Sequence, residues 1–93
     1  MSAYVVVHGT IKDKEKMQAY GKVAGPSVAS HGGEVVCRGP SEALAGVNAH
    51  TLMVVLKFPD QQAARDWYNS PEYQAIVPTR EAAMEAVFVI AGD

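Results

Sequence analysis

The stretch Phe58–Arg80, FPDQQAARDWYNSPEYQAIVPTR, combines a strand end, a capped helix, a sharp turn and a second short helix. Asp60 is a favourable N-cap, and we expect it to begin a helix that runs to about Tyr68. Ser70 followed by Pro71 predicts a break and a restart, because proline is favoured at the first helical position. The stretch also holds the only Trp and two of the four Tyr of the chain. We therefore expect it to position the core and any ligand site.

Short apolar and β-branched segments on both sides of this stretch predict a sheet. His50–Phe58 is apolar on both faces, which is typical of a central strand covered on both sides. In Ala3–Ile11, alternate residues belong to opposite faces of the sheet. Two shorter segments, Glu34–Arg38 and Ala86–Ile90, complete four predicted strands.

A long helix is predicted between the first two strands. Asp13 is a good N-cap, and we expect the helix to cover Lys14–His31. Pro26 lacks the amide hydrogen that a helix uses, so we expect a kink or a break there, which would open space between helix and sheet. Gly32 and Gly33 end the helix, because glycine accepts the left-handed conformation. Spacings of three and four define one apolar stripe: Met17, Tyr20, Ala24 and Val28.

The element order that follows is βαββαβ. We expect Pro78 and Thr79 to end the second short helix and Arg80–Met84 to be helical again. One layer of sheet and one of helices give the ferredoxin-like arrangement, an α+β fold with a four-stranded antiparallel sheet and helices on one face. The length fits a single domain over residues 1–93.

The sheet face without helices predicts a partner. Two helices cover only one face of a four-stranded sheet, so the other face would expose apolar residues such as Tyr4, Val6, Met53 and Val55. A second copy packed sheet to sheet would bury them. We predict a homodimer through the open sheet face, as in a dimeric α/β barrel.

Composition and charge exclude several classes of partner. The net charge of −2 and the lack of any Lys or Arg run argue against nucleic acid. No apolar run is long enough to cross a membrane, and the first residues do not form a signal peptide. One cysteine allows no intrachain disulfide, which suits a reducing compartment. We expect a cytoplasmic protein.

The histidines do not have the spacing of a metal site, so we expect neither a metal nor a bound cofactor. His8 is the best candidate for a general base or a haem ligand, and a buried or interfacial histidine with satisfied hydrogen bonds is the structural alternative. We expect His31 to cap the C-terminus of the first helix.

Several motifs resemble those of the DUF1330 family, a domain of unknown function. They are HGG at His31–Gly33, FP at Phe58–Pro59, A-x-x-W-Y-x-S-P-E-Y at Ala64–Tyr73, and Arg80. The resemblance covers nearly the whole chain and implies membership of the dimeric α/β-barrel superfamily. That superfamily includes cofactor-independent monooxygenases acting on aromatic polyketides, small isomerases and haem proteins.

The candidate ligand site lies between sheet and helices and is lined by Tyr20, Trp67, Tyr73 and Arg80. We expect Tyr20 to meet Tyr73 across a cleft. The Arg80 guanidinium is suited to a substrate carboxylate or enolate, and Arg80 with His8 are the candidate catalytic residues. The structural alternative for Trp67 is plain core packing.

Arg80 also has a structural alternative, which is an ion pair with Glu72 or Asp66 or a bond to free helix carbonyls. The first functional hypothesis is a small-molecule-binding domain, possibly a cofactor-independent enzyme of the proton-transfer, isomerase or monooxygenase type, with a small acidic or aromatic substrate. The second is a non-catalytic dimeric binding or structural protein. The third is a haem binder through His8 or His31. A cavity above about 300 Å³ favours the first hypothesis, and a filled core favours the second.

Overall fold

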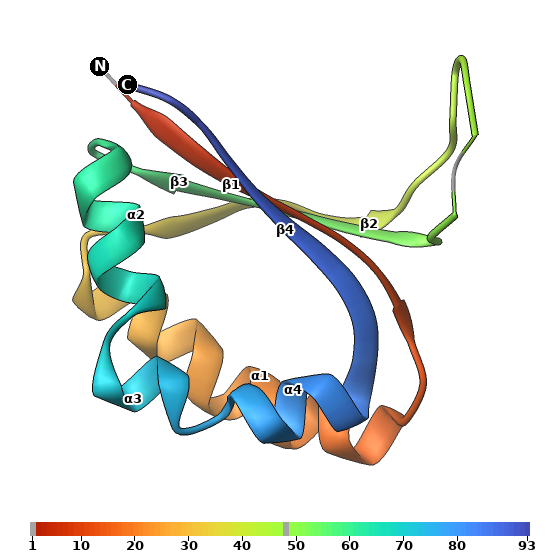
Figure 1. Cartoon of the computed structure of the whole chain (residues 1–93), viewed down its shortest axis with the longest axis horizontal. Coiled ribbons are helices and arrows are strands. Elements are labelled where there is room, and N and C mark those ends of the chain that lie inside the picture. The colour runs from red at the N-terminus through yellow and green to blue at the C-terminus, as the bar shows by residue number, and fades with distance from the viewer. Residues whose placement is uncertain (1, 48) are drawn as a thin grey trace.

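The computed structural model describes residues 2–47 and 49–93, which form a four-stranded antiparallel sheet with helices on one face (Figure 1). The strand order is β2-β3-β1-β4, so the fold is ferredoxin-like, as predicted. The elements in chain order are β1 (Ala3–Ile11), α1 (Lys14–Ser30), β2 (Glu34–Pro40), β3 (Leu52–Phe58), α2 (Gln61–Tyr68), α3 (Pro71–Gln74), α4 (Val77–Ala83) and β4 (Met84–Gly92).

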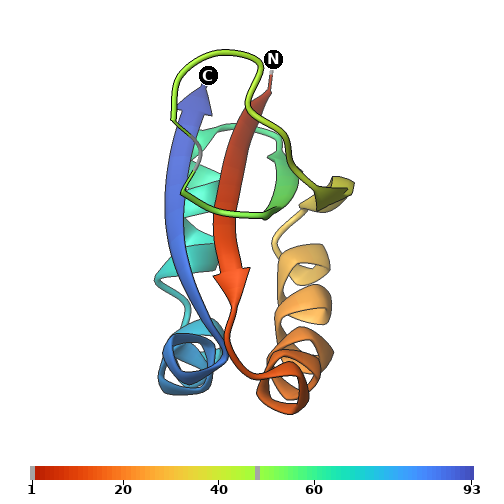
Figure 2. The same ribbon diagram turned by 90° about the vertical axis from the view of Figure 1, so that its right-hand side faces the viewer.

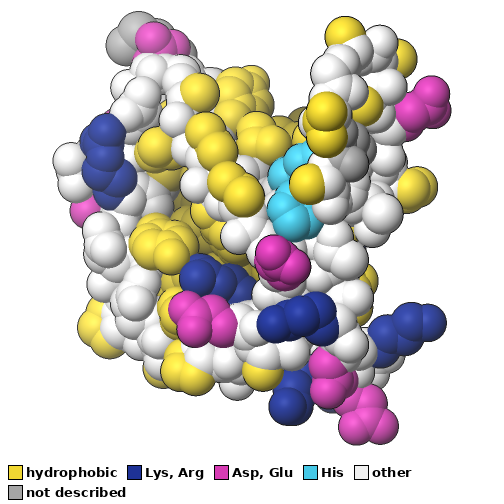
Figure 3. All heavy atoms as spheres, turned by 45° about the vertical axis from the view of Figure 1, so that its right-hand side comes forward, with side chains coloured by type: hydrophobic (Ala, Val, Ile, Leu, Met, Phe, Trp, Pro, Cys, Tyr) yellow, Lys and Arg dark blue, Asp and Glu magenta, His cyan; other side chains and the backbone are white. Residues whose placement is uncertain are grey.

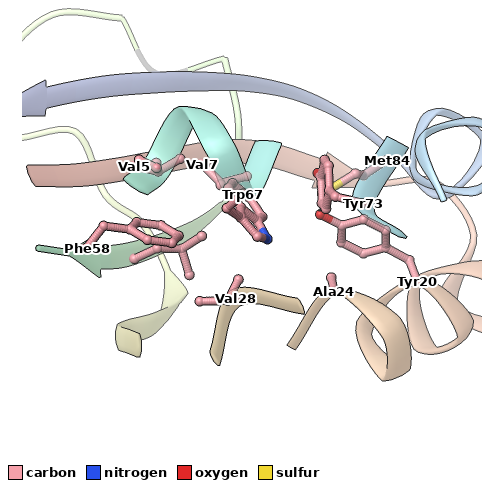
Figure 4. Close-up of a cluster of buried hydrophobic side chains, with 11 residues drawn as sticks. Val5, Val7, Tyr20, Ala24, Val28, Phe58, Trp67, Tyr73 and Met84 are labelled. Carbon is pink, nitrogen blue, oxygen red and sulfur yellow. Dashed lines mark hydrogen bonds between the residues drawn. The ribbon is translucent and has the colours of Figure 1, made fainter. Parts of the chain in front are cut away.

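The central strand β1 pairs with β3 on one side and with β4 on the other, and β1 and β4 lie side by side in Figure 2. Alternate β1 residues such as Val5 and Val7 are buried under the helices. The three largest fully buried side chains, Phe58, Trp67 and Tyr73, pack between this sheet face and the helices (Figure 4). The core therefore lies entirely on the helix-covered face of the sheet.

The predicted helix starts are confirmed. The side chains of Asp13, Asp60 and Ser70 each accept a hydrogen bond from the amide three residues further on, at 3.1, 2.8 and 3.2 Å. Each bond satisfies one of the amides that a helix leaves free at its N-terminus. Ser70 with Pro71 thus separates α3 from α2 as expected, and Gly32, with φ of 77°, follows α1.

The predictions at two prolines were wrong, and two other boundaries moved: the strand predicted from His50 begins at Leu52, and Met84 belongs to β4 rather than to a helix. Of the kink or break expected at Pro26, the break does not occur: α1 continues to Ser30 with the proline on its exposed side. A proline inside a helix removes one backbone hydrogen bond, and the flanking buried residues Ala24 and Val28 keep this turn packed against the core. Pro78 does not end a helix. It lies in the first turn of α4, where an amide hydrogen is not needed.

The edge strand β2 contains a β-bulge that the sequence did not predict. Up to Val35 its residues pair regularly with β3, and after the bulge the pairing resumes with Cys37 opposite Val55. Val36 is thus the extra residue. A bulge reverses the expected side of every later residue on the strand, because side chains alternate with period two.

Gly33 lies against Val28 of α1 and Phe58 of β3, and it provides a test of the packing. A Cβ at this position would lie 2.5 Å from Phe58 Cε1 and 2.7 Å from Val28 Cγ1. We predict that Gly33→Ala lowers the free energy of unfolding by about 1 to 3 kcal/mol, as for other overpacked cores. Urea unfolding measures the change. The control is Gly39→Ala, in β2, where an added Cβ meets nothing within 4 Å; equal losses in both variants would contradict the packing.

Candidate functional site

A cavity lies between α1 and the helix-covered face of the sheet. Its volume is about 110 Å³. Tyr20 and Trp67 form part of its wall, and Arg38 lies on it from the edge strand. Most of the remaining wall is apolar: Val7, Met17, Ala24, Val28, Val35, Leu52, Val54, Leu56, Met84 and Phe88. We call this space the α1 cavity.

Arg80, in the last turn of α4, is held by aromatic side chains. Its Nη1 donates hydrogen bonds to the hydroxyl oxygens of Tyr68, at 3.1 Å, and Tyr73, at 3.2 Å. Its guanidinium carbon lies 4.7 Å from the centre of the Phe88 ring, a favourable cation–π arrangement. Within the described parts of the chain, Arg80 forms no ion pair with a carboxylate, so the ion pair expected with Glu72 or Asp66 was wrong.

The hydrogen bonds continue from Arg80 to the wall of the α1 cavity. The Tyr73 hydroxyl lies 2.8 Å from the Tyr20 hydroxyl, and both side chains are buried. Figure 4 shows the two rings pointing toward one another, as the sequence analysis expected. The chain Arg80–Tyr73–Tyr20 therefore connects a cation to a residue of the cavity wall.

Burial determines the protonation of these tyrosines. It raises the pKa of Tyr20 well above its ordinary value, and the neighbouring Tyr73 raises it further. Burial also raises the pKa of Tyr73, although its hydrogen bonds with Tyr20 and Arg80 act in the opposite direction. For Arg80, burial lowers the pKa, but the hydrogen bonds to Tyr73 and Tyr68 outweigh it. At neutral pH Arg80 therefore carries a positive charge, and the hydroxyl groups of Tyr20 and Tyr73 are protonated. These three side chains can stabilise negative charge but cannot serve as a base.

The structure brings together four of the five predicted site residues. Tyr20 and Trp67 line the α1 cavity, while Tyr73 and Arg80 are joined to Tyr20 by hydrogen bonds. The structural alternative for Trp67 also holds, because it is 1% exposed and its indole N–H donates to Ser27 Oγ at 3.0 Å.

His8 does not join this group, so the expectation that it serves the same pocket was wrong. Strand alternation places it on the sheet face without helices, opposite Met53 and Val87 on the neighbouring strands. There its Nε2 lies 3.0 Å from Ser41 Oγ, and its ring packs edge-on against His50 at 5.4 Å between centroids. His8 and Arg80 of one chain thus lie on opposite sides of the sheet.

His31 has the structural role that the sequence indicated. Its Nδ1 lies 2.9 Å from the Ser27 carbonyl oxygen near the end of α1, and 3.4 Å from Glu72 Oε1. In the described residues, no cluster of three or more His, Cys, Asp or Glu side chains is suited to a metal ion. No described helix is long and apolar enough to cross a membrane.

Sequence reasoning missed two residues of the site, Phe88 and Arg38. Phe88 completes the surroundings of Arg80 together with Tyr68, and its inward position follows from the strand period once the boundaries are known. Arg38 lies on the wall of the α1 cavity only because of the bulge in β2. No sequence signal marks this bulge.

Comparison with solved structures shows the class of fold. A protein of unknown function from Rhodopseudomonas palustris matches with a TM-score of 0.77 and 21% identity, covering 99% of this chain and 82% of that one. SnoaB, a cofactor-independent oxygenase from Streptomyces nogalater, matches with a TM-score of 0.72 and 11% identity, covering 99% and 92%. A dimeric ferredoxin-like protein of unknown function from Thermobifida fusca matches with a TM-score of 0.66 and 14% identity. The match covers 100% of this chain and 92% of that one.

The chain belongs to the family described as Domain of unknown function (DUF1330), whose model matches residues 2–92. This confirms the resemblance found in the sequence. No curated protein matches the chain.

The raised pKa of Tyr20 predicts a loss of stability at high pH. In the unfolded chain a tyrosine loses its proton near pH 10, whereas folded Tyr20 retains it. The unfolded state therefore binds fewer protons above about pH 10, so the free energy of unfolding falls as the pH rises. We predict that Tyr20→Phe makes this fall shallower, by up to about 1.4 kcal/mol per pH unit. Urea unfolding of both proteins at about pH 8 and 11 measures it, and parallel curves would contradict a buried, protonated Tyr20.

Proposed function

We propose that the protein binds a small acidic or aromatic organic molecule in the α1 cavity. The observation that carries this proposal is the hydrogen-bonded chain from Arg80 through Tyr73 to Tyr20 in the cavity wall. A half-buried guanidinium without a carboxylate partner leaves a positive potential that favours a negatively charged ligand.

The chemistry that this site favours starts from a ligand that is already acidic. No described Asp, Glu or His belongs to the cavity wall, and the tyrosines stay protonated at neutral pH. The Tyr20 and Trp67 donors are bonded to Tyr73 and Ser27, so the wall offers the Arg38 guanidinium for negative charge on oxygen but no general base. Among cofactor-independent reactions, this arrangement suits those whose substrate binds as an anion or readily forms an enolate or phenolate. It is less suited to an isomerisation, which needs a base from the protein.

The relationship to SnoaB supports the catalytic version of the proposal. That protein is a cofactor-independent oxygenase with the same fold. The match at 11% identity carries the fold alone, so an oxygenase-type activity in this chain is part of the proposal.

The second candidate is a non-catalytic dimeric binding or structural protein. The α1 cavity, at about 110 Å³, is smaller than the roughly 300 to 1,000 Å³ of typical ligand pockets. Every described buried side-chain nitrogen or oxygen has a hydrogen-bond partner, as in a core that serves packing.

The residues present do not fit a haem. His31 is engaged with the Ser27 carbonyl and Glu72, and neither His8 nor His31 lines the α1 cavity. The third hypothesis therefore finds no support in the geometry.

Trp67 provides the test of ligand binding, because it is the only tryptophan and lines the cavity. We predict that phenol or benzoate changes the intrinsic fluorescence saturably. Gly21 lies on the cavity wall and an added Cβ there meets nothing within 4 Å, so Gly21→Leu is expected to fill the cavity and abolish the change. Gly21→Ala is the matched control and retains binding. If neither probe gives a saturable change with the unmodified protein, the cavity is not a ligand site.

We propose in addition that the chain is a homodimer joined through the sheet face without helices. Tyr4, Val87 and Val89 on that face are 37%, 53% and 53% exposed. Figure 3 shows hydrophobic side chains reaching the surface along the sheet beside the projecting loop. A stable interface buries about 800 Å² per partner. The Thermobifida fusca relative is described as dimeric.

Light scattering tests the dimer. We predict twice the chain mass for the unmodified protein and the single mass for a Val87→Lys, Val89→Lys double variant, because two charges would be buried without partners. Both valines are about half exposed in one chain, so the variant is expected to fold. Val23→Lys, on the outer side of α1 at 42% exposure, is the control and keeps the dimer. A single chain mass for the unmodified protein, at micromolar concentration, would rule the interface out.

A further inference from the structure

Arg38 owes its position to the bulge in β2. Glu34 pairs with Lys57 on the open face, and Val35 pairs with Leu56 on the helix-covered face. Without the extra residue Val36, strict alternation would return Arg38 to the open face. The bulge instead places Arg38 opposite Val54, on the same side as the helices, and its side chain lines the α1 cavity. Bulges are frequent next to functional sites, where they redirect a side chain.

Arg38 lies where the α1 cavity meets the solvent. A second, wider hollow of about 400 Å³ adjoins the cavity and shares Met17, Gly21 and Arg38 with it. Arg38 and Lys22 both line this outer hollow. Two cations therefore flank the entrance to an apolar interior.

No negative charge compensates these cations in the described structure. Neither the cavity nor the outer hollow has an Asp or Glu in its wall, and Arg38 forms no ion pair among residues 2–47 and 49–93. The whole chain carries a net charge of −2, so a positive entrance is opposite in sign to the average surface. An anion is thus attracted to this entrance.

The interior limits the size of the rest of the ligand. The cavity holds about 110 Å³ and is lined mainly by aliphatic and aromatic side chains, Tyr20 among them. An engineered apolar cavity of about 150 Å³ in another protein is large enough for benzene. A single ring or a short branched chain is therefore the largest body that this interior accepts without rearrangement.

From these observations we infer that the ligand is a small amphipathic carboxylate. Its charged group is bound by Arg38 and Lys22 at the entrance, and its single ring or short branched chain enters the cavity toward Trp67. This inference rests on the proposed binding function and specifies the class of ligand. Arg38 can bind the carboxylate with two parallel hydrogen bonds, which a lysine cannot do.

Benzoate and benzyl alcohol, followed by Trp67 fluorescence, test the inference. They share a ring and differ in charge. We expect the unmodified protein to bind benzoate about tenfold or more tightly, because hydrogen bonds to charged groups are strong. In Arg38→Gln we expect this preference to disappear through loss of benzoate affinity, with benzyl alcohol unchanged. Arg65→Gln is the matched control: it removes the same charge from an exposed arginine outside the cavity wall and keeps the preference.

A charge reversal gives a second, independent measurement. Arg38→Glu is expected to reject benzoate and to bind benzylamine, whose ammonium group matches the new charge. Because Arg38 is exposed and has no ion pair in the described chain, both variants are expected to fold, and circular dichroism checks this. Benzoate affinity is also expected to fall with added salt.

The outcomes separate the inference from the function on which it rests. Equal affinities for benzoate and benzyl alcohol, or a benzoate preference that survives in Arg38→Gln, would overturn the carboxylate assignment and leave the cavity as a binding site. A lack of saturable response to both compounds would overturn the binding function, and the carboxylate assignment with it.

Discussion

The rest of the structure depends on how one buried indole is accommodated. Trp67 packs against Phe58 and Tyr73, with ring centroids 5.5 and 4.5 Å apart, and fills the space between sheet and helices. Its N–H is also buried and needs an acceptor, because an unpaired polar group in a core is costly. Ser27 of α1 supplies it, so the distance between α1 and α2 is set by a hydrogen bond as well as by packing. The α1 cavity lies beside this contact, and a shift of α1 would change both together.

The same arrangement explains why charge is retained inside the fold. Arg80 is surrounded by the rings of Tyr68, Tyr73 and Phe88, which cover its guanidinium without neutralising it. A carboxylate in this place would have cancelled the charge. The break at Ser70 therefore has a purpose beyond capping: it brings α4 back across the end of the sheet, where Arg80 meets the tyrosines.

Local features were predictable from the sequence, and features that depend on pairing were not. The three side-chain caps and the limits of β1 follow from residue types within a few positions, and the fold follows from the order of the elements. The continuation of α1 through Pro26 depends on tertiary packing, which outweighs one lost backbone bond. The side on which His8 lies follows from alternation once Tyr4 and Val6 are assigned to the open face, so placing His8 in the pocket conflicted with that pattern. The position of Arg38 on the cavity wall depends on a one-residue shift in the pairing of β2 with β3. No local sequence pattern predicts such a shift.

The bulge has a further consequence for the free edge of the sheet. β2 has no neighbour on its outer side in the described chain, and a regular edge strand offers its unpaired amides and carbonyls to any other strand. The extra residue Val36 interrupts that regular row and twists the strand locally. Strand addition, the first step of edge-to-edge aggregation, is thereby made less favourable at the one edge where exposed Val35 and Val36 would otherwise promote it. One inserted residue thus protects the chain against non-native association.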